Sequence, residues 1–134
     1  KTHEKYAEDW LKNSTRLDTK YFVGRAFEIA GVDSEAEKYY RDVLNKTYAV
    51  KGTQAEKELS LLENLPSTDR LNLRLAQTHF GKKDYKSSYD FLKEIKKPEE
   101  LTDDEQIERV ELAVKLLEQR GEQKSAIRYL TELL

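Results

Sequence analysis

The chain has 134 residues, no cysteine and a net charge of −2, and charged and hydrophobic residues each make up 37% of it. Without cysteine a disulfide or a thiolate metal site is excluded, and the near-balanced charge gives no long-range attraction to nucleic acid or anionic lipid. No apolar run approaches the ~18 residues of a membrane span. We expect one domain over residues 1–134, cut from a longer protein because the chain begins at Lys1, in the cytoplasm or periplasm without preference.

Residues 2–16 are predicted to form the first helix. Its apolar stripe contains Tyr6, Ala7, Trp10 and Leu11. Trp10 is the only tryptophan of the chain, and we expect it to cover the end of the core. The alternative is that Trp10 anchors a partner at an exposed edge.

Two amphipathic helices are predicted next, over about 18–30 and 34–47, folded back on each other through a turn. Ser34 followed three residues later by Glu37 predicts a capping box at the start of the second helix. Together the two helices form a first unit that covers about 17–48.

Six positions define this unit, and the steps between them are 3, 4, 5, 4 and 3: Gly24, Phe27, Gly31, Ala36, Tyr40 and Val43. Steps of 3 and 4 keep side chains on one helical face, and the step of 5 spans the turn. The small residues let two helix axes approach closely, and the aromatic ones fill the space beside them. The same steps recur in two later sets: Ala76, His79, Lys83, Ser88, Leu92 and Ile95, then Val114, Leu117, Gly121, Ala126, Leu130 and Leu133.

An extra helix is predicted over 53–65, because the first two sets lie 52 residues apart instead of about 34. Pro66 is expected to stop this helix, which is either an insertion or a degenerate repeat. The second unit then covers about 67–98, and Ser67 can cap its first helix. The third unit covers about 103–134 and opens with a long helix to residue 120.

The pattern resembles the tetratricopeptide repeat (TPR), a helix-turn-helix unit of about 34 residues. The first unit matches the small, aromatic, glycine, alanine and aromatic positions of that family: Gly24, Phe27, Gly31, Ala36 and Tyr40. The later units depart from it, for example where His79 replaces an aromatic residue and Val114 a small one. The resemblance implies an all-α fold, a right-handed α-solenoid of antiparallel helix pairs with about 7–8 helices.

The resemblance also implies a non-enzymatic scaffold that binds a partner peptide or helix on its concave surface, within a larger bacterial assembly. No catalytic, metal or cofactor residue is expected, since no such motif is present. The partner-binding groove is predicted on the first helix of each unit: Tyr21, Arg25, Glu28, Arg70, Leu73, Gln77, Phe80, Glu108, Glu111, Lys115 and Glu118. The alternative is self-association through the C-terminal helix, whose Leu130, Leu133 and Leu134 need a cover. A helical-repeat nucleic-acid binder is less favoured, because the acidic residues of the third unit oppose it.

Overall fold

A computed structural model describes residues 16–119 and residue 128 of the chain. Within residues 16–119 it contains six α-helices, one short 3-10 helix and no strand, so this part is all-α as predicted. The helices are α2 (Leu17–Ile29), α3 (Asp33–Val50), α4 (Gln54–Leu62), α5 (Thr68–Gly81), α6 (Tyr85–Lys93), η1 (Pro98–Glu100) and α7 (Asp103–Gln119). The helix predicted at 2–16 and nearly all of the third unit beyond α7 lie outside the described residues.

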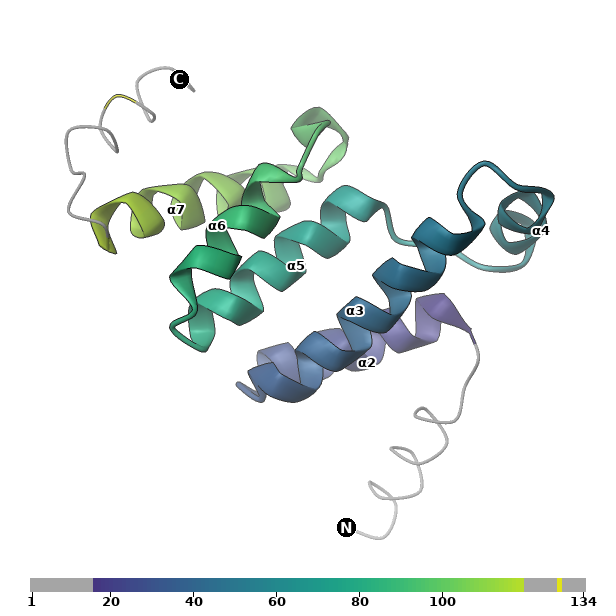
Figure 1. Ribbon diagram of the computed structural model, residues 1–134, viewed down its shortest axis with the longest axis horizontal. Coiled ribbons are helices and arrows are strands. Elements are labelled where there is room, and N and C mark those ends of the chain that lie inside the picture. Colours follow the sequence, from purple (N-terminus) through teal and green to yellow (C-terminus); the bar gives the residue numbers. More distant parts are fainter. Residues whose placement is uncertain (1–15, 120–127, 129–134) are drawn as a thin grey trace, which may run out of the picture.

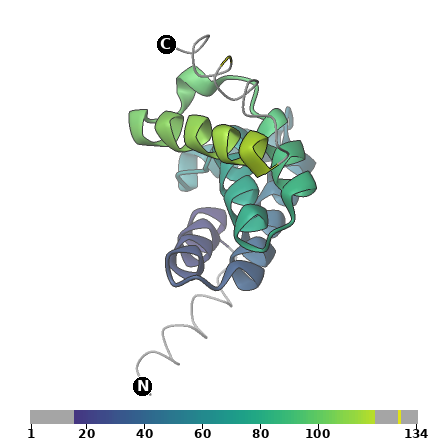
Figure 2. The same cartoon turned by 90° about the vertical axis from the view of Figure 1, so that its left-hand side faces the viewer.

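The helices keep their chain order in space. Helix α2 packs against α3, α3 against α5, α5 against α6, and α7 against both α5 and α6. The α2–α3 pair therefore lies at one end, α5 and α6 in the middle, and α7 at the other end (Figures 1 and 2). The extra helix α4 lies beyond the C-terminal end of α3, apart from this row (Figure 1).

The turns after α2 and α5 have the same backbone geometry, 52 residues apart. Gly31 has a φ of 81° and Lys83 a φ of 65°, so both lie in the left-handed region. In each turn the amide of this residue donates to the carbonyl three residues earlier, at 3.0 Å in both cases. The next amide donates to the carbonyl five residues before it, at 2.8 Å after Gly31 and 2.9 Å after Lys83. The spacing of the sequence thus corresponds to a repeated backbone path at these two turns.

Small residues lie where these helices approach one another. A Cβ atom added to Gly24 would be 2.8 Å from the ring of Tyr40, a distance that real Cβ contacts do not show. Ala36, Ala76 and Ser88 are each 0% exposed, and the Ser88 hydroxyl donates to the carbonyl of Ala76 at 2.6 Å. Larger side chains at these positions would push the helices apart. Ala126, the corresponding residue of the third unit, lies outside the described residues.

Helix α5 lies between two hydrophobic clusters and supplies residues to both. Leu71 and Leu75 join the cluster formed with α2 and α3: Leu17, Ala36, Tyr40, Val43 and Leu44. Leu73 and Ala76 join the cluster formed with α6 and α7: Leu92, Leu101, Leu112, Ala113 and Leu116. Burial of both sides of α5 joins the α2–α3 pair to the rest of the molecule.

Two predictions about helix ends are wrong. Helix α3 begins one residue before Ser34, and its N-cap residue makes no side-chain capping bond. Glu37 instead accepts hydrogen bonds from Arg41 at 3.0 Å and from Lys82 at 2.6 Å, so a contact with α5 replaces the capping box.

Helix α4 ends at Leu62, before the predicted end at residue 65, and the backbone of Glu63 is already extended. The carboxylate of Glu63 accepts from the backbone amides of Leu17 and Asp18, at 2.5 and 3.1 Å. It therefore caps the first turn of α2 from 45 residues away in the sequence.

None of the described helices is both long enough and apolar enough to cross a bilayer.

Candidate functional site

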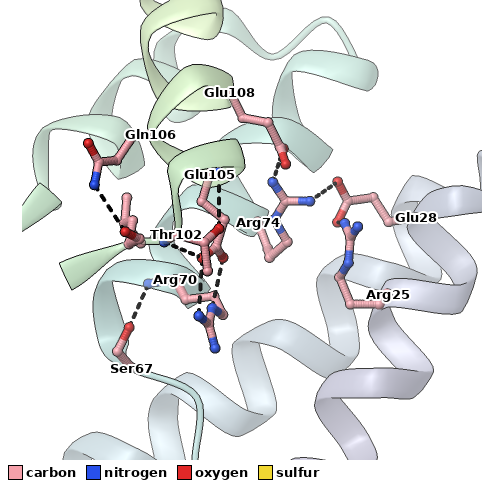
Figure 3. A network of polar contacts seen from close by, with 10 residues as sticks. Arg25, Glu28, Ser67, Arg70, Arg74, Thr102, Glu105, Gln106 and Glu108 are labelled. Carbon is pink, nitrogen blue, oxygen red and sulfur yellow. Dashed lines mark hydrogen bonds and ion pairs between the residues drawn. The ribbon is translucent and has the colours of Figure 1, made fainter. Parts of the chain in front are cut away.

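The predicted groove residues come from three helices that lie side by side. Tyr21, Arg25 and Glu28 are on α2, four residues are on α5, and Glu108, Glu111, Lys115 and Glu118 are on α7. Figure 3 shows that several of these side chains point toward one another and form a network of ion pairs. We call the six charged members the arginine–glutamate network: Arg25, Glu28, Arg70, Arg74, Glu105 and Glu108.

Arg74 is the centre of this network and links all three helices. Its side chain is 3% exposed, and one guanidinium nitrogen donates to Glu28 of α2 at 3.2 Å. Another donates to Glu108 of α7 (Figure 3). Glu28 also accepts from Arg25 at 3.0 Å and from the hydroxyl of Tyr40 at 2.6 Å. A buried charge is stable only with such partners, so Arg74 fixes the relative positions of α2, α5 and α7.

A second ion pair joins α5 to α7 one turn away. Two nitrogens of Arg70 donate to the two carboxylate oxygens of Glu105, at 2.7 and 3.1 Å, in the bidentate geometry that suits a guanidinium. Glu105 also accepts from the backbone amide of Thr102, whose hydroxyl accepts from the amide of Glu105, which makes a capping box at the start of α7. Burial alone would raise the pKa of Glu105, but the bonds from Arg70 and Thr102 hold it below its ordinary value.

The network is internally balanced, since three arginines face three glutamates. Tyr40, which donates a hydrogen bond to Glu28, does not change this balance. Burial is the larger cause and the hydrogen bond to Glu28 the second cause of a pKa of Tyr40 far above its ordinary value, so Tyr40 is a neutral donor at physiological pH. Because each carboxylate already accepts from an arginine, the network offers neither an excess of positive charge for phosphate nor a general base.

The apolar residues of the prediction have different environments. Tyr21 and Phe80 are half-buried, and their rings contact Tyr40 at 5.8 Å and Tyr85 at 5.3 Å between centroids. Leu73 is 0% exposed and belongs to the cluster with α6 and α7, so it does not line the surface on which it was predicted. The reason is that α5 is covered on both sides, so that of the residues predicted on it only Arg70, Gln77 and Phe80 stay partly exposed.

Gln77, Glu111 and Lys115 complete the predicted set. The amide of Gln77 lies 3.5 Å from the Glu108 carboxylate, next to Arg74. Glu111 and Lys115 are exposed on α7, within one to two turns of Glu108. Glu118 is also exposed, near the end of α7. The arginine–glutamate network thus has exposed polar neighbours on the α7 side.

Arg74 was absent from the predicted set although it is the central residue. A signal was present in the sequence: Arg70, Arg74 and Gln77 are spaced by 4 and 3, so they share one helical face. The predicted set contains Leu73 instead, which lies three residues after Arg70 and four before Gln77 and therefore fits helical spacing equally well. Three leucines at alternate positions around Arg74 make the polar face that contains this arginine hard to recognise from the sequence. Only the position of the neighbouring helices separates these two faces.

A separate polar cluster surrounds His79, on the other side of α5. His79 is 4% exposed and stacks on Phe91 with ring centroids 5.2 Å apart. Its Nδ1 lies 3.2 Å from Asp84 and its Nε2 lies 3.0 Å from Arg41, so a proton on Nδ1 gives both ring nitrogens a partner. His79 thus links Arg41 of α3 to Asp84 in the turn before α6, and this is a structural role in the packing of the helices.

Other residues of the described part of the chain line open surface depressions. One of about 330 Å³ is lined by Lys20, Glu35, Lys38, Tyr39 and Asp42. Another, of about 290 Å³, is lined by Arg41, Ser87, Asp90, Phe91 and Glu94. Neither includes a residue of the arginine–glutamate network.

Among the residues that the structure describes, no group of three or more histidine, aspartate or glutamate side chains could hold a metal ion. No protein-family model, curated protein or solved structure matches the chain.

Proposed function

We propose that the protein is a non-enzymatic interaction scaffold, built as a TPR-like α-solenoid, that binds a peptide or helix of a partner protein on the surface shared by α2, α5 and α7. The observation that carries this proposal is the arginine–glutamate network, in which the predicted Arg25, Glu28, Arg70 and Glu108 meet two further residues, Arg74 and Glu105, where α2, α5 and α7 come together. In this proposal the scaffold is part of a larger bacterial assembly.

Two features of the surface support a rigid binding platform. Arg74 holds three helices in fixed positions through Glu28 and Glu108, so a partner would meet a preformed surface and lose little free energy to ordering it. Phe80 and Tyr21, each half-buried beside other rings, supply apolar area next to the network.

The charge balance of the network indicates what kind of segment it would recognise. With arginines and glutamates already paired, a strongly acidic or basic peptide would have to break existing ion pairs. We therefore expect an amphipathic segment that places apolar side chains near Phe80 and polar ones near Gln77, Glu111 and Lys115.

The proposal is tested by selecting binders from a displayed peptide library with the whole 134-residue chain. The affinity of a selected peptide is then measured by calorimetry for the natural chain and for the variant Phe80→Ala with Lys115→Glu. We expect this variant to bind at least about tenfold more weakly, which corresponds to ~1.4 kcal/mol.

The matched control changes exposed residues on α3 and α6, Lys38→Glu with Asp90→Lys, and should leave the affinity unchanged. Equal binding by the surface variant and the natural chain, or a library that yields no binder, would contradict the proposal.

Self-association is the second candidate, and exposed apolar residues of the described chain favour it. Phe22, Ile29, Leu61 and Leu62 are each more than half exposed, and such residues often mark contact surfaces. Leu130, Leu133 and Leu134, which first suggested this alternative, lie outside the described residues. Sedimentation at several concentrations distinguishes it, because a strict monomer excludes self-association of this chain.

A further inference from the structure

His79 is buried between an arginine and two carboxylates, and its ring can reach all three. In the neutral ring, Nδ1–H donates to Asp84 at 3.2 Å and Nε2 accepts from Arg41 at 3.0 Å. A carboxylate oxygen of Glu37 lies 3.4 Å from the same Nε2, so this nitrogen has a second partner within reach. Because an arginine can only donate and a carboxylate can only accept, the two partners of Nε2 suit opposite protonation states of the ring.

The charged groups that face His79 balance one another while its ring is neutral. Glu37 and Arg41 come from α3, and Lys82 and Asp84 come from the turn between α5 and α6. Glu37 accepts from Nε of Arg41 at 3.0 Å and from Lys82 at 2.6 Å. A proton on the ring adds a positive charge to this balanced group, which favours the departure of whichever cation is held least firmly.

Arg41 is the cation that can move, because the imidazole is fixed by packing. His79 is 4% exposed and stacks on Phe91 of α6, with 5.2 Å between the ring centroids. The side chain of Arg41 is 46% exposed, and its guanidinium lies over the same phenyl ring, 5.2 Å from the centroid. Arg41 also lines the open depression of about 290 Å³ together with Asp90 and Glu94. A guanidinium that leaves the imidazole therefore has carboxylates near it at the surface.

We propose that His79 is a pH-sensitive switch that sets the position of Arg41 on the surface formed by α3 and α6. When the ring is neutral, Nε2 accepts from the terminal guanidinium nitrogen and holds Arg41 against Phe91. When the ring is protonated, Nε2–H donates to Glu37 instead, and the guanidinium turns outward into the depression. Histidine suits this role, because it is the side chain whose charge ordinarily changes between about pH 5 and 8.

Side-chain NMR of the natural chain tests the switch in a titration from about pH 8 to about pH 5. The ring nitrogens of His79 report its tautomer and its protonation, and the guanidinium signals that disappear in Arg41→Lys report the position of Arg41. We expect a neutral ring with its proton on Nδ1, and Arg41 signals that change with the same midpoint as the ring. The guanidinium of Arg70, which is paired with Glu105, is the internal control, and its signals should stay constant.

The variant His79→Gln removes the titrating ring, and the Arg41 signals should then no longer depend on pH. Three results in the natural chain would each overturn the proposal: a neutral ring with its proton on Nε2, a ring that stays neutral throughout the titration, or Arg41 signals that stay constant while the ring titrates. Because these results need no variant of His79, the test does not depend on how well His79→Gln folds. Arg41 signals that still follow the pH in a folded His79→Gln chain would also refute the switch.

Discussion

Lys83 has a left-handed backbone conformation that its side chain disfavours, at the position where the first turn has Gly31. Non-glycine residues lose roughly 1–2 kcal/mol in this region, because Cβ crowds the following carbonyl. The turn after α5 is nevertheless closed by the same hydrogen bonds as the turn after α2. The backbone path is therefore imposed by the packing of the two helices.

Replacing Lys83 with glycine should stabilise the protein by about 0.5–1 kcal/mol, since relief of the left-handed strain exceeds the added flexibility of the unfolded chain. The reverse change, Gly31→Ala, should cost about 1 kcal/mol through the backbone alone, because an added Cβ there meets no atom within 4 Å. Urea unfolding measures both changes. Lys86→Gly, in the first turn of α6, is the control and should destabilise. A destabilising Lys83→Gly would mean that the lysine side chain has a role of its own.

Asp18 gives the stability of the protein a defined dependence on pH. The hydrogen bond from Arg16, reinforced by the backbone amides of Asn64 and Thr19, lowers the pKa of Asp18 to about 2. The unfolded value is about 3.9, so the folded state favours the carboxylate, and its contribution is complete above the unfolded pKa and disappears as the pH falls toward 2.

The free energies of unfolding of the natural chain and of Asp18→Asn should therefore differ by a constant amount between pH 5 and pH 7, with the natural chain more stable. Below about pH 4 the difference should shrink. Chemical denaturation at a series of pH values measures it. A difference that stays constant down to pH 2 would show that Asp18 titrates normally in the folded protein.

At the scale of the elements, α5 determines how the parts fit together. Its leucines alternate between two clusters, and its Arg74 joins the helices on either side. A buried ion pair that loses one member leaves an uncompensated charge, and this is costlier than replacing every member. The arrangement of α2, α5 and α7 thus depends on one side chain of the central helix.

The change Arg74→Met should destabilise the protein by about 3 kcal/mol, because Glu28 and Glu108 lose a buried partner. Combining it with Glu28→Gln and Glu108→Gln should restore part of this loss. Lys38→Met removes an exposed ion pair with Glu35 and should cost less than ~1 kcal/mol. Equal effects of Arg74→Met and Lys38→Met in denaturant unfolding would argue against a central role for Arg74.

The sequence predicted the elements well and their mutual contacts less well. Steps of 3 and 4 located α2, α3, α5 and α7, and the small residues Gly24 and Ala36 marked a real close approach, because helical periodicity and side-chain size are local properties. Glu37 and Leu73 were misplaced because their surroundings come from other helices. The carboxylate of Glu63, which caps α2 from a distant part of the chain, has no local signal at all.

At the scale of the whole molecule, the helices form a row in which side chains of α2, α5 and α7 meet (Figure 3), while His79 of α5 contacts Arg41 of α3 and Phe91 of α6. Ion pairs between arginines and glutamates hold α2, α5 and α7 together at this surface, and their charges neutralise one another. We expect a partner to bind there and to leave the α3 and α6 side unchanged.

Amide chemical-shift mapping of the isotope-labelled chain with a selected peptide tests this expectation most directly. The account predicts that the shifted amides cluster around Arg25, Gln77 and Glu111, with little change around Lys38 and Asp90. Shifts concentrated on α3 and α6, with the amides around Arg25, Gln77 and Glu111 unperturbed, would contradict it.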